Sequence, residues 1–542
     1  MTPTLLCLFL LASLALRGLC LVVYNVWFHP LRQFPGPWMA GATSWWRAYR
    51  EVIKHQDLAQ ELFGLHERYG DVVRIAPNEL HFGSPSAFHD IYHNSRRWDK
   101  DPRLYRTPGV SSGSVVFPKY AQAKERRDVL LPVFSRRSIK NLEHLIWRNA
   151  TRLSSAITKA NAANQSIDLL YAFRSFTLDT IMGFTIGSCI NALDAPAFRD
   201  PLLPAMDASL RLMPLLKNFP TFRDLVFAIP PALVMRLVPN AARLAPRLYQ
   251  VRTLIGRQLQ AVLESPEKLD AASHQTIFHH MLDPRAYKRS GQQEQQQQLP
   301  DLTALHDEGF TLIFAGANTV ADTLVQAHWH AMRNPALLAR LREEVTAVWP
   351  DLDHNRDHPP LSLADLEKLP LLTATIKEAL RFTPPGPSLT RVVPAGGARI
   401  GAHWVPGGTV VGMAIVHVHK ATRIWGADAA EFRPERWLDM NNNDTSNTSS
   451  SKSPDANTAS ASAPALDPAV DLHHYLVAFS RGPRMCLGVN LAWAELYIAL
   501  ATMVRRFEIR VDRTTEEDMQ WRDCIAAYYP RRHLHAWCRP VQ

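Results

Sequence analysis

The sequence predicts a mainly α-helical protein with small β-sheets, in which one large domain follows an apolar N-terminal segment. Long helix-like stretches dominate the chain, whereas the runs typical of strands are short and bounded by glycine and proline. With 542 residues, 46% of them hydrophobic, the chain has enough apolar material for a large core. No linker long enough to divide the body occurs before residue 440, so we expect a single domain.

The N-terminal segment is long enough to span a membrane. Leu5 to Phe28 contains only one charged residue, Arg17, and a bilayer core requires about 20 apolar residues. A cleaved signal peptide is the alternative, but no basic residue precedes the apolar run. Arginines follow it, which places the rest of the chain on the cytosolic side. We therefore expect a membrane anchor over residues 1–33 and the main domain over residues 34–542.

Strand signals occur in two places. Val72–Ile75 and Glu79–Phe82 flank a short turn and predict a β-hairpin. Residues Ala398 to Met413 predict a further sheet segment, interrupted by glycine and proline.

Helices are predicted between and after these strands. Residues 441–463, rich in Asn, Ser, Thr and Ala, are expected to form a disordered insertion. The predicted long helices are Ile139 to Asn161, Ala241 to Glu264, Asp301 to Arg333, Pro370 to Phe382 and Val489 to Leu500.

Cysteine usage and charge exclude several classes of protein. The six cysteines, at 7, 20, 189, 486, 524 and 538, lack the spacing of a metal finger and the density of a secreted scaffold. The net charge of +10 is not concentrated in a basic cluster interleaved with aromatic residues, so no nucleic-acid partner is expected. A basic face that docks an acidic protein or lies on anionic lipid explains the charge better.

One cysteine lies in an unusual setting. Cys486 precedes an apolar helical run, and the partial positive charge at a helix start favours a thiolate that can bind a metal. Gly482 and Gly488 allow a tight turn and the close approach of a flat ligand. Phe479 can pack on the loop, and Arg484 can meet an acidic ligand edge. A buried structural cysteine is the alternative for any cysteine considered alone.

The segment from Phe479 to Gly488 resembles the haem-ligand loop of the cytochrome P-450 family, Phe-x-x-Gly-x-Arg-x-Cys-x-Gly. The resemblance implies the cytochrome P-450 fold. It also implies that Cys486 is the thiolate ligand of the iron of haem b, and that Arg484 faces a haem propionate.

A buried ionic network is a second feature of the resemblance. Glu378 and Arg381 are three residues apart and share a helix face. Alone, such a pair is usually a solvated surface pair of little energy. The later segment Phe432–Trp437 resembles the family's Pro-Glu-Arg-Trp segment, and its Arg436 is then the third member of a network behind the haem.

The helix over Asp301 to Arg333 contains the third feature. Ala315–Thr319 resembles the family's oxygen-binding motif, in which small residues leave room for dioxygen and the hydroxyl of Thr319 handles protons. Asn318 stands where the family usually has a carboxylate, and an amide cannot exchange a proton near neutral pH. Asp322, one turn later, could substitute. The alternative for Thr319 is a hydroxyl that bonds its own helix carbonyl.

Two further arginines are expected to anchor the haem. Arg126 lies in a segment that resembles the family's propionate-binding helix, although Gln122 replaces the usual Trp or His. Arg391 matches the arginine of the strand that follows the Glu378 helix. Unplaced, each is an ordinary surface arginine.

The N-terminal part is similar to fungal microsomal members of the family. The resemblance implies a monooxygenase that inserts one oxygen atom from O2 into a lipophilic small molecule of secondary metabolism. NADPH would supply electrons through a separate cytochrome P-450 reductase, with cytochrome b5 as a further donor, at the endoplasmic-reticulum membrane. The expected pocket residues are Val110 to Phe117, Phe310, Phe314, Ala315, Leu389 and Ala526 to Tyr529.

Two alternatives remain open at this point. Asn318 is also compatible with a haem-thiolate isomerase or dehydratase, or with a peroxide-driven oxidase, none of which needs protons delivered during reductase-driven turnover. A haem-binding or membrane scaffold protein without turnover is the third hypothesis.

Overall fold

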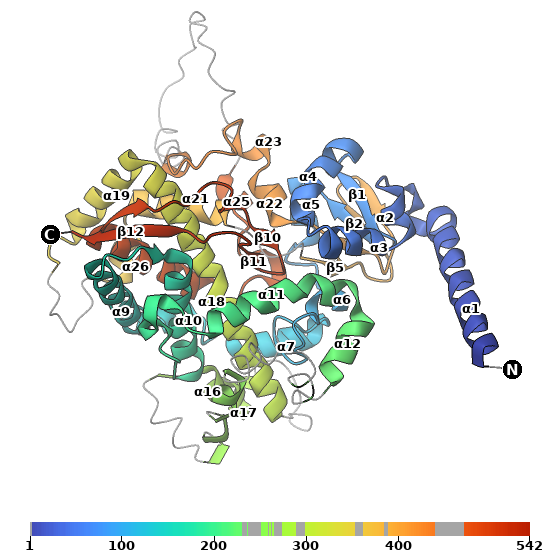
Figure 1. Ribbon diagram of the computed structural model, residues 1–542, viewed down its shortest axis with the longest axis horizontal. Coiled ribbons are helices and arrows are strands. Elements are labelled where there is room, and N and C mark those ends of the chain that lie inside the picture. Colours follow the sequence, from blue (N-terminus) through green and yellow to red (C-terminus); the bar gives the residue numbers. More distant parts are fainter. Residues whose placement is uncertain are drawn as a thin grey trace, which may run out of the picture.

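The described part of the chain forms a sheet-containing region beside the N-terminal helix and a larger helical region (Figure 1). The structure is a computed structural model. It describes residues 3–229, 251–257, 259–261, 263–264, 274–288, 299–352, 361–383, 389–438 and 471–541, and the single positions 233 and 236.

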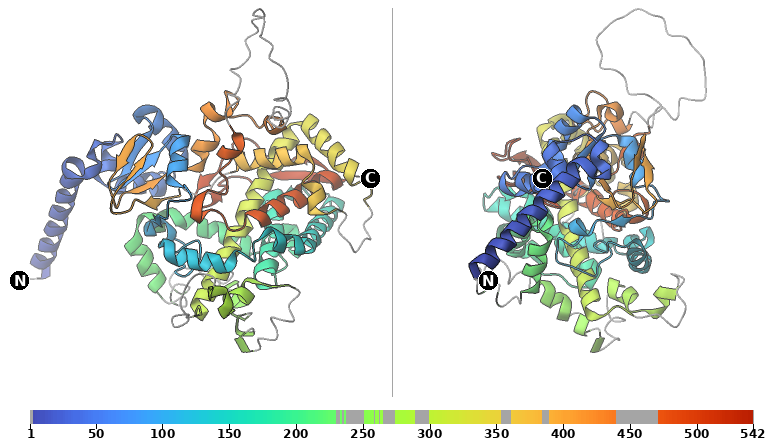
Figure 2. Two further views of the ribbon diagram at one scale, coloured as in Figure 1. Left: turned by 180° about the vertical axis from the view of Figure 1, so that it is seen from behind. Right: turned by 90° about the vertical axis from the view of Figure 1, so that its right-hand side faces the viewer.

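The N-terminal segment is a helix that stands away from the body (Figures 1 and 2). Helix α1 runs from Pro3 to Val23 and continues in a π-helical turn from Tyr24 to Phe28. None of the residues of α1 is buried. The span Pro3–Phe28 has a mean hydropathy of 2.5, so its length and composition fit the predicted membrane anchor.

The sheet region contains the predicted hairpin. Strands β1 (Val72–Ala76) and β2 (Glu79–Phe82) pair antiparallel, which confirms the prediction. They extend into a five-stranded sheet in the order β1-β2-β8-β5-β3. The added strands are β8 (Val410–Gly412), β5 (Arg391–Val392) and β3 (Asp99–Lys100).

The sheet segment predicted over Ala398 to Met413 is split between two sheets. Strands β6 (Ala398–Ile400) and β7 (His403–Val405) form a separate hairpin, and only β8 joins the main sheet. The turn at Gly407 explains the division, because a Cβ there would collide with the carbonyl oxygen of Ala395. Gly408 follows with a φ of +78°, in the left-handed region.

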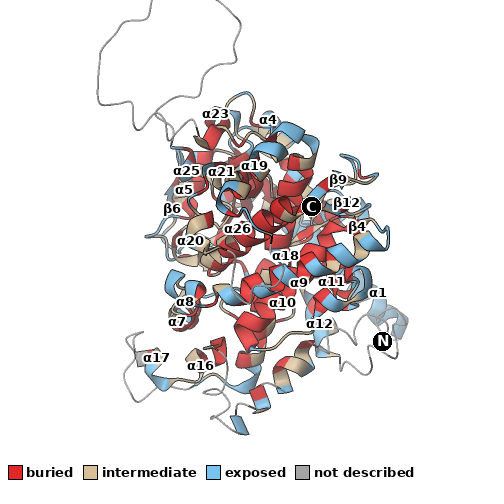
Figure 3. Ribbon diagram, turned by 90° about the vertical axis from the view of Figure 1, so that its left-hand side faces the viewer, coloured by how far each residue is buried: buried red, intermediate tan, exposed pale blue. Residues whose placement is uncertain are grey.

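The helical region is built around two central helices. Helix α10 (Leu169–Ile186) is buried along its whole length and packs against α18 (Leu302–Arg333) (Figure 3). The carboxylate of Asp301 accepts the N–H of Ala304 and caps α18. The helices predicted at 301–333, 370–382 and 489–500 are confirmed as α18, α21 (Pro370–Phe382) and α26 (Val489–Arg506).

The single helix predicted from Ile139 to Asn161 is two helices, α8 (Arg136–Asn141) and α9 (Glu143–Ala162). Leu142 leaves the helical conformation, with φ −104° and ψ 9°, and buries its side chain. The next residue, Glu143, accepts the N–H of Leu363, so a long-range contact accompanies the break.

The remaining elements surround this core. Of the predicted helix 241–264, residues 251–257, 259–261 and 263–264 are described and helical; the predicted insertion 441–463 lies outside the described residues. Further strands are β4 (Ile167–Asp168), β9 (Phe507–Val511), β10 (Arg522–Asp523), β11 (Ala527–Tyr528) and β12 (His535–Pro540). Further helices are α2 (Trp38–Ala42), α3 (Trp45–Ala48), α4 (Leu58–Tyr69), α5 (Pro85–Ile91), α6 (Pro102–Tyr105), α7 (Tyr120–Leu130), α11 (Leu202–Asn218), α12 (Pro220–Ala228), α16 (Ile277–Met281), α17 (Pro284–Lys288), α19 (Pro335–Val348), α20 (Leu363–Leu366), α22 (Ile415–His419), α23 (Thr422–Trp425) and α25 (Leu472–Tyr475).

Candidate active site

The Cys486 loop is a constrained turn at the start of α26. The N–H of Cys486 donates to the carbonyl of Phe479 at 2.9 Å. Gly482 has a φ of +75°, and a Cβ there would collide with the carbonyl oxygen of Tyr92. At Gly488 no atom lies within 4 Å of where a Cβ would be. The protein itself therefore requires glycine at 482, whereas at 488 glycine leaves open space beside the loop.

The thiol of Cys486 borders an internal space. Its side chain is exposed, yet the surrounding protein raises the pKa of the thiol by burial, against the opposing effects of the Gly488 N–H and Arg127. Ala315 and Thr319 are also exposed, although they lie in the middle of the central helix α18. Groups that are exposed inside the molecule line a hollow, and α18 contacts α26, the helix after the cysteine.

The small residues of α18 have two different roles. Ala315 borders the internal space, as expected for the oxygen side. Gly316 instead faces α10, since a Cβ there would lie 2.7 Å from the side chain of Ile181. The expectation that Gly316 leaves room for dioxygen is therefore corrected, because this glycine allows the two central helices to approach.

The three predicted proton-handling residues of α18 do not share one environment. Thr319 is exposed to the internal space, and its Oγ1 donates to the carbonyl of Ala315 at 3.0 Å. Asn318 and Asp322 are buried. A carboxylate oxygen of Asp322 lies 3.7 Å from the guanidinium of Arg174 on α10. Burial raises the pKa of Asp322 to about 7, against the lowering effect of Arg174.

A cluster of cations lies near the cysteine loop, in which Arg391 is buried and Arg484 is half-buried. Arg484 donates to the carbonyl of Phe117 at 2.6 Å, Arg391 to the hydroxyl of Tyr105 at 3.3 Å. Burial, and then the nearby charge of Arg391, lower the pKa of Arg484 to about 10.

Lys100 belongs to the same cluster, and sequence reasoning did not assign it to the site. Its Nζ donates to the carbonyl of Val115 at 2.7 Å. Its pKa is lowered well below the usual value by burial, and then by Arg484, Arg391 and Arg127. Nothing in the local sequence of the short strand β3 indicates that Lys100 belongs to the site. Only the fold places it near Arg484, which lies almost 400 positions later in the sequence.

These cations fit an acidic ligand. Within the described residues, none of Lys100, Arg127, Arg391 and Arg484 forms an ion pair with a carboxylate, and Nη1 of Arg484 is buried without a hydrogen-bond partner. Buried charges are normally paired, so this donor set suits an anionic group such as a haem propionate. The residues present therefore fit haem b, with Cys486 as the iron ligand.

Arg126 and Arg127 have different partners. The guanidinium of Arg126 forms an ion pair with the buried Glu308 of α18 at 3.3 Å. Arg127 donates from Nη1 to the carbonyl of Met485 at 2.7 Å and thus contacts the cysteine loop. The charge of Arg126, predicted to anchor the haem, is therefore shared with a carboxylate, because Glu308 lies on the facing helix.

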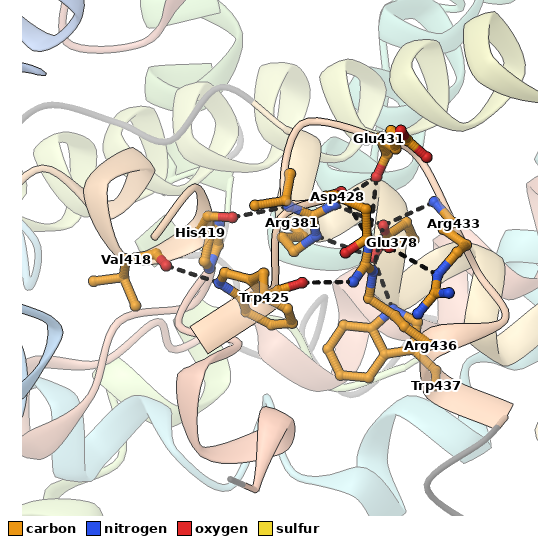
Figure 4. A network of polar contacts seen from close by, with 11 residues as sticks. Glu378, Arg381, Val418, His419, Trp425, Asp428, Glu431, Arg433, Arg436 and Trp437 are labelled. Atoms are coloured by element: carbon orange, nitrogen blue, oxygen red, sulfur yellow. Dashed lines mark hydrogen bonds and ion pairs between the residues drawn. The ribbon is translucent and has the colours of Figure 1, made fainter. Parts of the chain in front are cut away.

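The predicted network of Glu378, Arg381 and Arg436 is confirmed as buried and connected (Figure 4). Oε1 of Glu378 accepts from Arg381 at 2.7 Å and from Arg436 at 3.0 Å. The indole N–H of Trp437 donates to the other carboxylate oxygen at 2.9 Å, a member that sequence reasoning missed. Arg381 also donates to the backbone carbonyls of His419 and Ala429.

The predicted pocket residues come from several elements. The loop Val110 to Phe117 is tied to α18 by two carboxylates, since Asp307 accepts the N–H of Ser111 at 3.0 Å and Glu308 that of Ser114 at 2.8 Å. These two acidic residues were also missed. Phe310 and Phe314 are partly buried, and Ala526 to Tyr529 adjoins α18. Leu389 is the first described residue after position 383.

Comparison with known proteins agrees with this geometry. The family model described as Cytochrome P-450 matches residues 39–530. Cytochrome P-450 monooxygenase flvC from Aspergillus flavus is 32% identical, over 98% of this chain and 95% of the relative. Cytochrome P-450 monooxygenase macH from Penicillium terrestre is 30% identical over 94% and 92% of the two chains. Tryptophan 6-hydroxylase fscE from Fusarium equiseti is 29% identical over 92% and 90%.

Proposed function

Because the chain belongs to the cytochrome P-450 family and is a monooxygenase, we propose that it inserts one oxygen atom from O2 into a C–H or C=C bond of a lipophilic small molecule. The proposal is supported by the exposure of Cys486, Ala315 and Thr319 and by the contact between α18 and α26. Haem b, when bound, supplies the activation of dioxygen, and thiolate ligation favours cleavage of the O–O bond.

The chain's own residues hold the cofactor at two edges. The thiolate of Cys486 is the iron ligand, and the loop conformation set by Gly482 orients it. Lys100, Arg391 and Arg484 are assigned to the propionates, since their charges lack carboxylate partners within the described residues. Arg127 supports the loop through Met485, and Arg126 links α7 to α18 through Glu308.

Electrons reach this enzyme from NADPH through a separate cytochrome P-450 reductase, with cytochrome b5 as a second donor. The family match takes up residues 39–530, and the apolar helix precedes it. The net charge of +10 favours docking of an acidic partner. Helix α1 anchors the enzyme in the endoplasmic-reticulum membrane, with the body on the cytosolic side.

The substrate class is drawn from the relatives and from the pocket. One relative is named as a tryptophan 6-hydroxylase and another as a conidiogenone synthase, so the relatives differ in the molecules their names refer to. Phe310 and Phe314, with ring centroids 4.4 Å apart on α18, supply an apolar aromatic surface. We therefore assign the enzyme to the tailoring of lipophilic secondary metabolites in a fungus.

One observation favours a second candidate function. Asn318 replaces the usual carboxylate, which an isomerase, a dehydratase or a peroxide-driven oxidase would not need. The buried acid at Asp322 argues for the monooxygenase, because it puts a titrating group one turn away.

Purified full-length enzyme with reductase separates these functions. With a panel of lipophilic substrates, the monooxygenase consumes NADPH and O2 and incorporates one atom of labelled oxygen into the product. Product formation without reductase and O2 would establish the isomerase or dehydratase, and turnover with added peroxide alone would establish the oxidase. Haem binding with no turnover under any of these conditions would leave the scaffold hypothesis.

A further inference from the structure

We propose that a hydrated polar pocket between α18 and α10, lined by Asn318, Asp322 and Arg174, conducts protons from the surface at Asp207 to the side of Thr319. The proposal rests on the monooxygenase function. It assigns to this chain a proton route in which the acid lies one helical turn beyond the position where the family usually has a carboxylate. The route continues through the two neighbouring helices α10 and α11.

The α18 end of the route follows from helical spacing. Asn318 and Asp322 are four residues apart, and Asp322 is three residues from Thr319, so Asp322 is one turn from both. Asn318 and Asp322 are buried, whereas Thr319 borders the internal space. The buried pair therefore lies on the helix face next to the one that carries the Thr319 hydroxyl.

Arg174 connects two carboxylates from different helices. This arginine of α10 is 1% exposed, and its Nη1 donates to a carboxylate oxygen of Asp207 on α11 at 2.5 Å. The 3.7 Å from its Nη2 to Asp322 is too long for a direct hydrogen bond. Tyr171 donates from its hydroxyl to the other oxygen of Asp207 at 2.9 Å. The guanidinium of Arg174 therefore donates a direct hydrogen bond to Asp207 but forms only a longer ion pair with Asp322.

On the Asp322 side of the pocket, buried polar atoms have no hydrogen-bond partner within the described part of the chain. Within the described residues, Oδ1 of Asn318, Oδ1 of Asp322, and Nε and Nη2 of Arg174 have no hydrogen-bond partner. Leaving such an atom unsatisfied destabilises the folded protein, because the atom has lost its hydrogen bonds to water. Native proteins fill such sites with ordered water when several polar groups converge. Donor and acceptor atoms converge here from two helices, so the pocket is expected to hold water.

The outer end of the route reaches solvent at Asp207, whose side chain is 12% exposed. The other titratable groups that act on Asp322 are His533, which bonds Asp168 at 2.9 Å, and Tyr529, whose hydroxyl accepts from Gln326 at 3.4 Å. Neither of them lies between Asp207 and Asp322 in the chain of contacts through Arg174.

The transfer conserves protons at each step. A proton enters by water beside Asp207 and moves through pocket water to the carboxylate of Asp322, which becomes a neutral acid. The acid passes its proton to the water that Oδ1 of Asn318 orients, and this water passes a proton to Oγ1 of Thr319 as that hydroxyl releases its own proton into the internal space. Asp322 is then a carboxylate again. Arg174 stays charged throughout, because Asp207 and Asp322 raise its pKa against the effect of burial.

The test uses the full-length enzyme with its reductase and two shape-conserving variants, Asp322→Asn and Asp207→Asn. The measurements are hydrogen peroxide released per NADPH consumed, the rate in H2O and D2O, and the carboxylic-acid C=O band in the infrared spectrum. Asp523→Asn is the matched control, since burial raises the pKa of Asp523 to about 7 as well, but its charged neighbours are Lys217, Asp57 and Glu51.

We expect Asp322→Asn to lower product formation by up to about 10²-fold, the low end of what general acid catalysis contributes, and to raise peroxide release. It should also remove one acid band and abolish the solvent isotope effect on coupling. Asn318→Asp should restore coupling in that background. Asp523→Asn should remove a different acid band and leave coupling unchanged.

Unchanged coupling and isotope effect in both Asp322→Asn and Asp207→Asn, with normal haem content, would overturn the relay. Its failure is distinct from that of the proposed function, because wild-type enzyme would still consume NADPH and O2. If Asp322→Asn does not fold, Asp207→Asn decides alone, since it keeps an acceptor for Arg174 and removes only the outer acid.

Discussion

The networks around Glu378 and around Asp322 are both buried clusters of carboxylates and arginines, yet they differ in how completely their polar atoms are paired. Glu378 accepts from Arg381, Arg436 and Trp437 through both oxygens, and the arginines donate further to backbone carbonyls. Around Asp322 and Arg174, four polar atoms have no partner among the described residues. The side-chain polar atoms of Glu378, Arg381 and Arg436 are all paired by protein groups, whereas the network around Asp322 is expected to hold water.

This difference separates a structural role from a chemical one. A fully paired network cannot change protonation without losing several hydrogen bonds at once, so it fixes the positions of α21 and the segment at Arg436. A network with unpaired atoms tolerates a change of charge at Asp322. The cation cluster of Lys100, Arg391 and Arg484 is a third case, because an anionic ligand is needed to pair its charges.

Breaking the complete network should have the largest effect on stability. Glu378→Gln leaves the charge of Arg381 buried without a counterion and leaves Arg436 only the partly exposed Asp428, and we expect a loss of about 3–5 kcal/mol in the free energy of unfolding. Denaturant titration of the haem-loaded protein measures it. Glu435→Gln is the control, because its pair with Arg340 is exposed and should contribute at most about 1 kcal/mol. Equal losses in the two variants would refute the structural role assigned to Glu378.

Removing one charge from the cation cluster should stabilise the haem-free protein and weaken the binding of haem. Lys100→Met removes a buried charge that lacks a carboxylate partner in the described part, so the haem-free protein should gain stability. The same change should weaken haem binding by about 1.5–3 kcal/mol, the contribution of a hydrogen bond to a charged group. Haem-loss kinetics and unfolding of the haem-free protein check both signs.

Lys119→Met serves as the control for Lys100→Met. Its ammonium is 71% exposed and pairs with Asp99 at the surface, so neither quantity should change measurably. If haem were lost faster from both lysine variants, the assignment of Lys100 to the haem site would be wrong.

The incomplete network should make stability depend on pH. Asp322 has a pKa of about 7 in the folded protein, above the usual 3.8, so the folded state binds the extra proton between about pH 4 and 7. Stability from this group is therefore present at low pH and lost as pH rises through 7, with a slope of up to about 1.4 kcal/mol per pH unit. Asp322→Asn should flatten this slope in unfolding measured from pH 4 to 8. An unchanged slope would mean that Asp322 does not titrate in this range.

Removal of the anchor should affect none of these sites. A chain that starts at Phe34 lacks α1, none of whose residues is buried, and should leave the membrane fraction yet bind haem. It also lacks Leu31, which is buried in a core cluster, so its stability should fall. Flotation on vesicles and the haem spectrum measure the two properties. Failure of the shortened chain to take up haem would show that residues 1–33 belong to the fold.

The sequence predicted those parts of the fold that local signals determine. Helices α18 and α21 begin at Asp301 and Pro370, both helix-start residues, and their bounds were predicted within a residue. The strand signal over 398–413 was read as one sheet segment, because periodicity does not specify which strand a segment pairs with. The triad around Glu378 was predicted only because two separate motifs indicated it together.

The rest of the site depends on long-range placement. Lys100 and Arg127 reach the cysteine loop only in the folded chain, and nothing in their local sequence distinguishes them from surface cations. Arg174 lies in a mostly apolar helix, 148 positions before Asp322, and no motif indicated that it would contact both Asp207 and Asp322.

The ligand at Cys486 is the central claim, and the spectrum of the reduced carbon monoxide complex tests it most directly. The red-shifted Soret band requires thiolate donation to the iron, so Cys486→Ser should abolish it. Cys189→Ser should leave it intact, since Cys189 contacts Asn191 and lies apart from the loop. Survival of the band in Cys486→Ser would show that another residue binds the iron and would contradict the assignment of the active site.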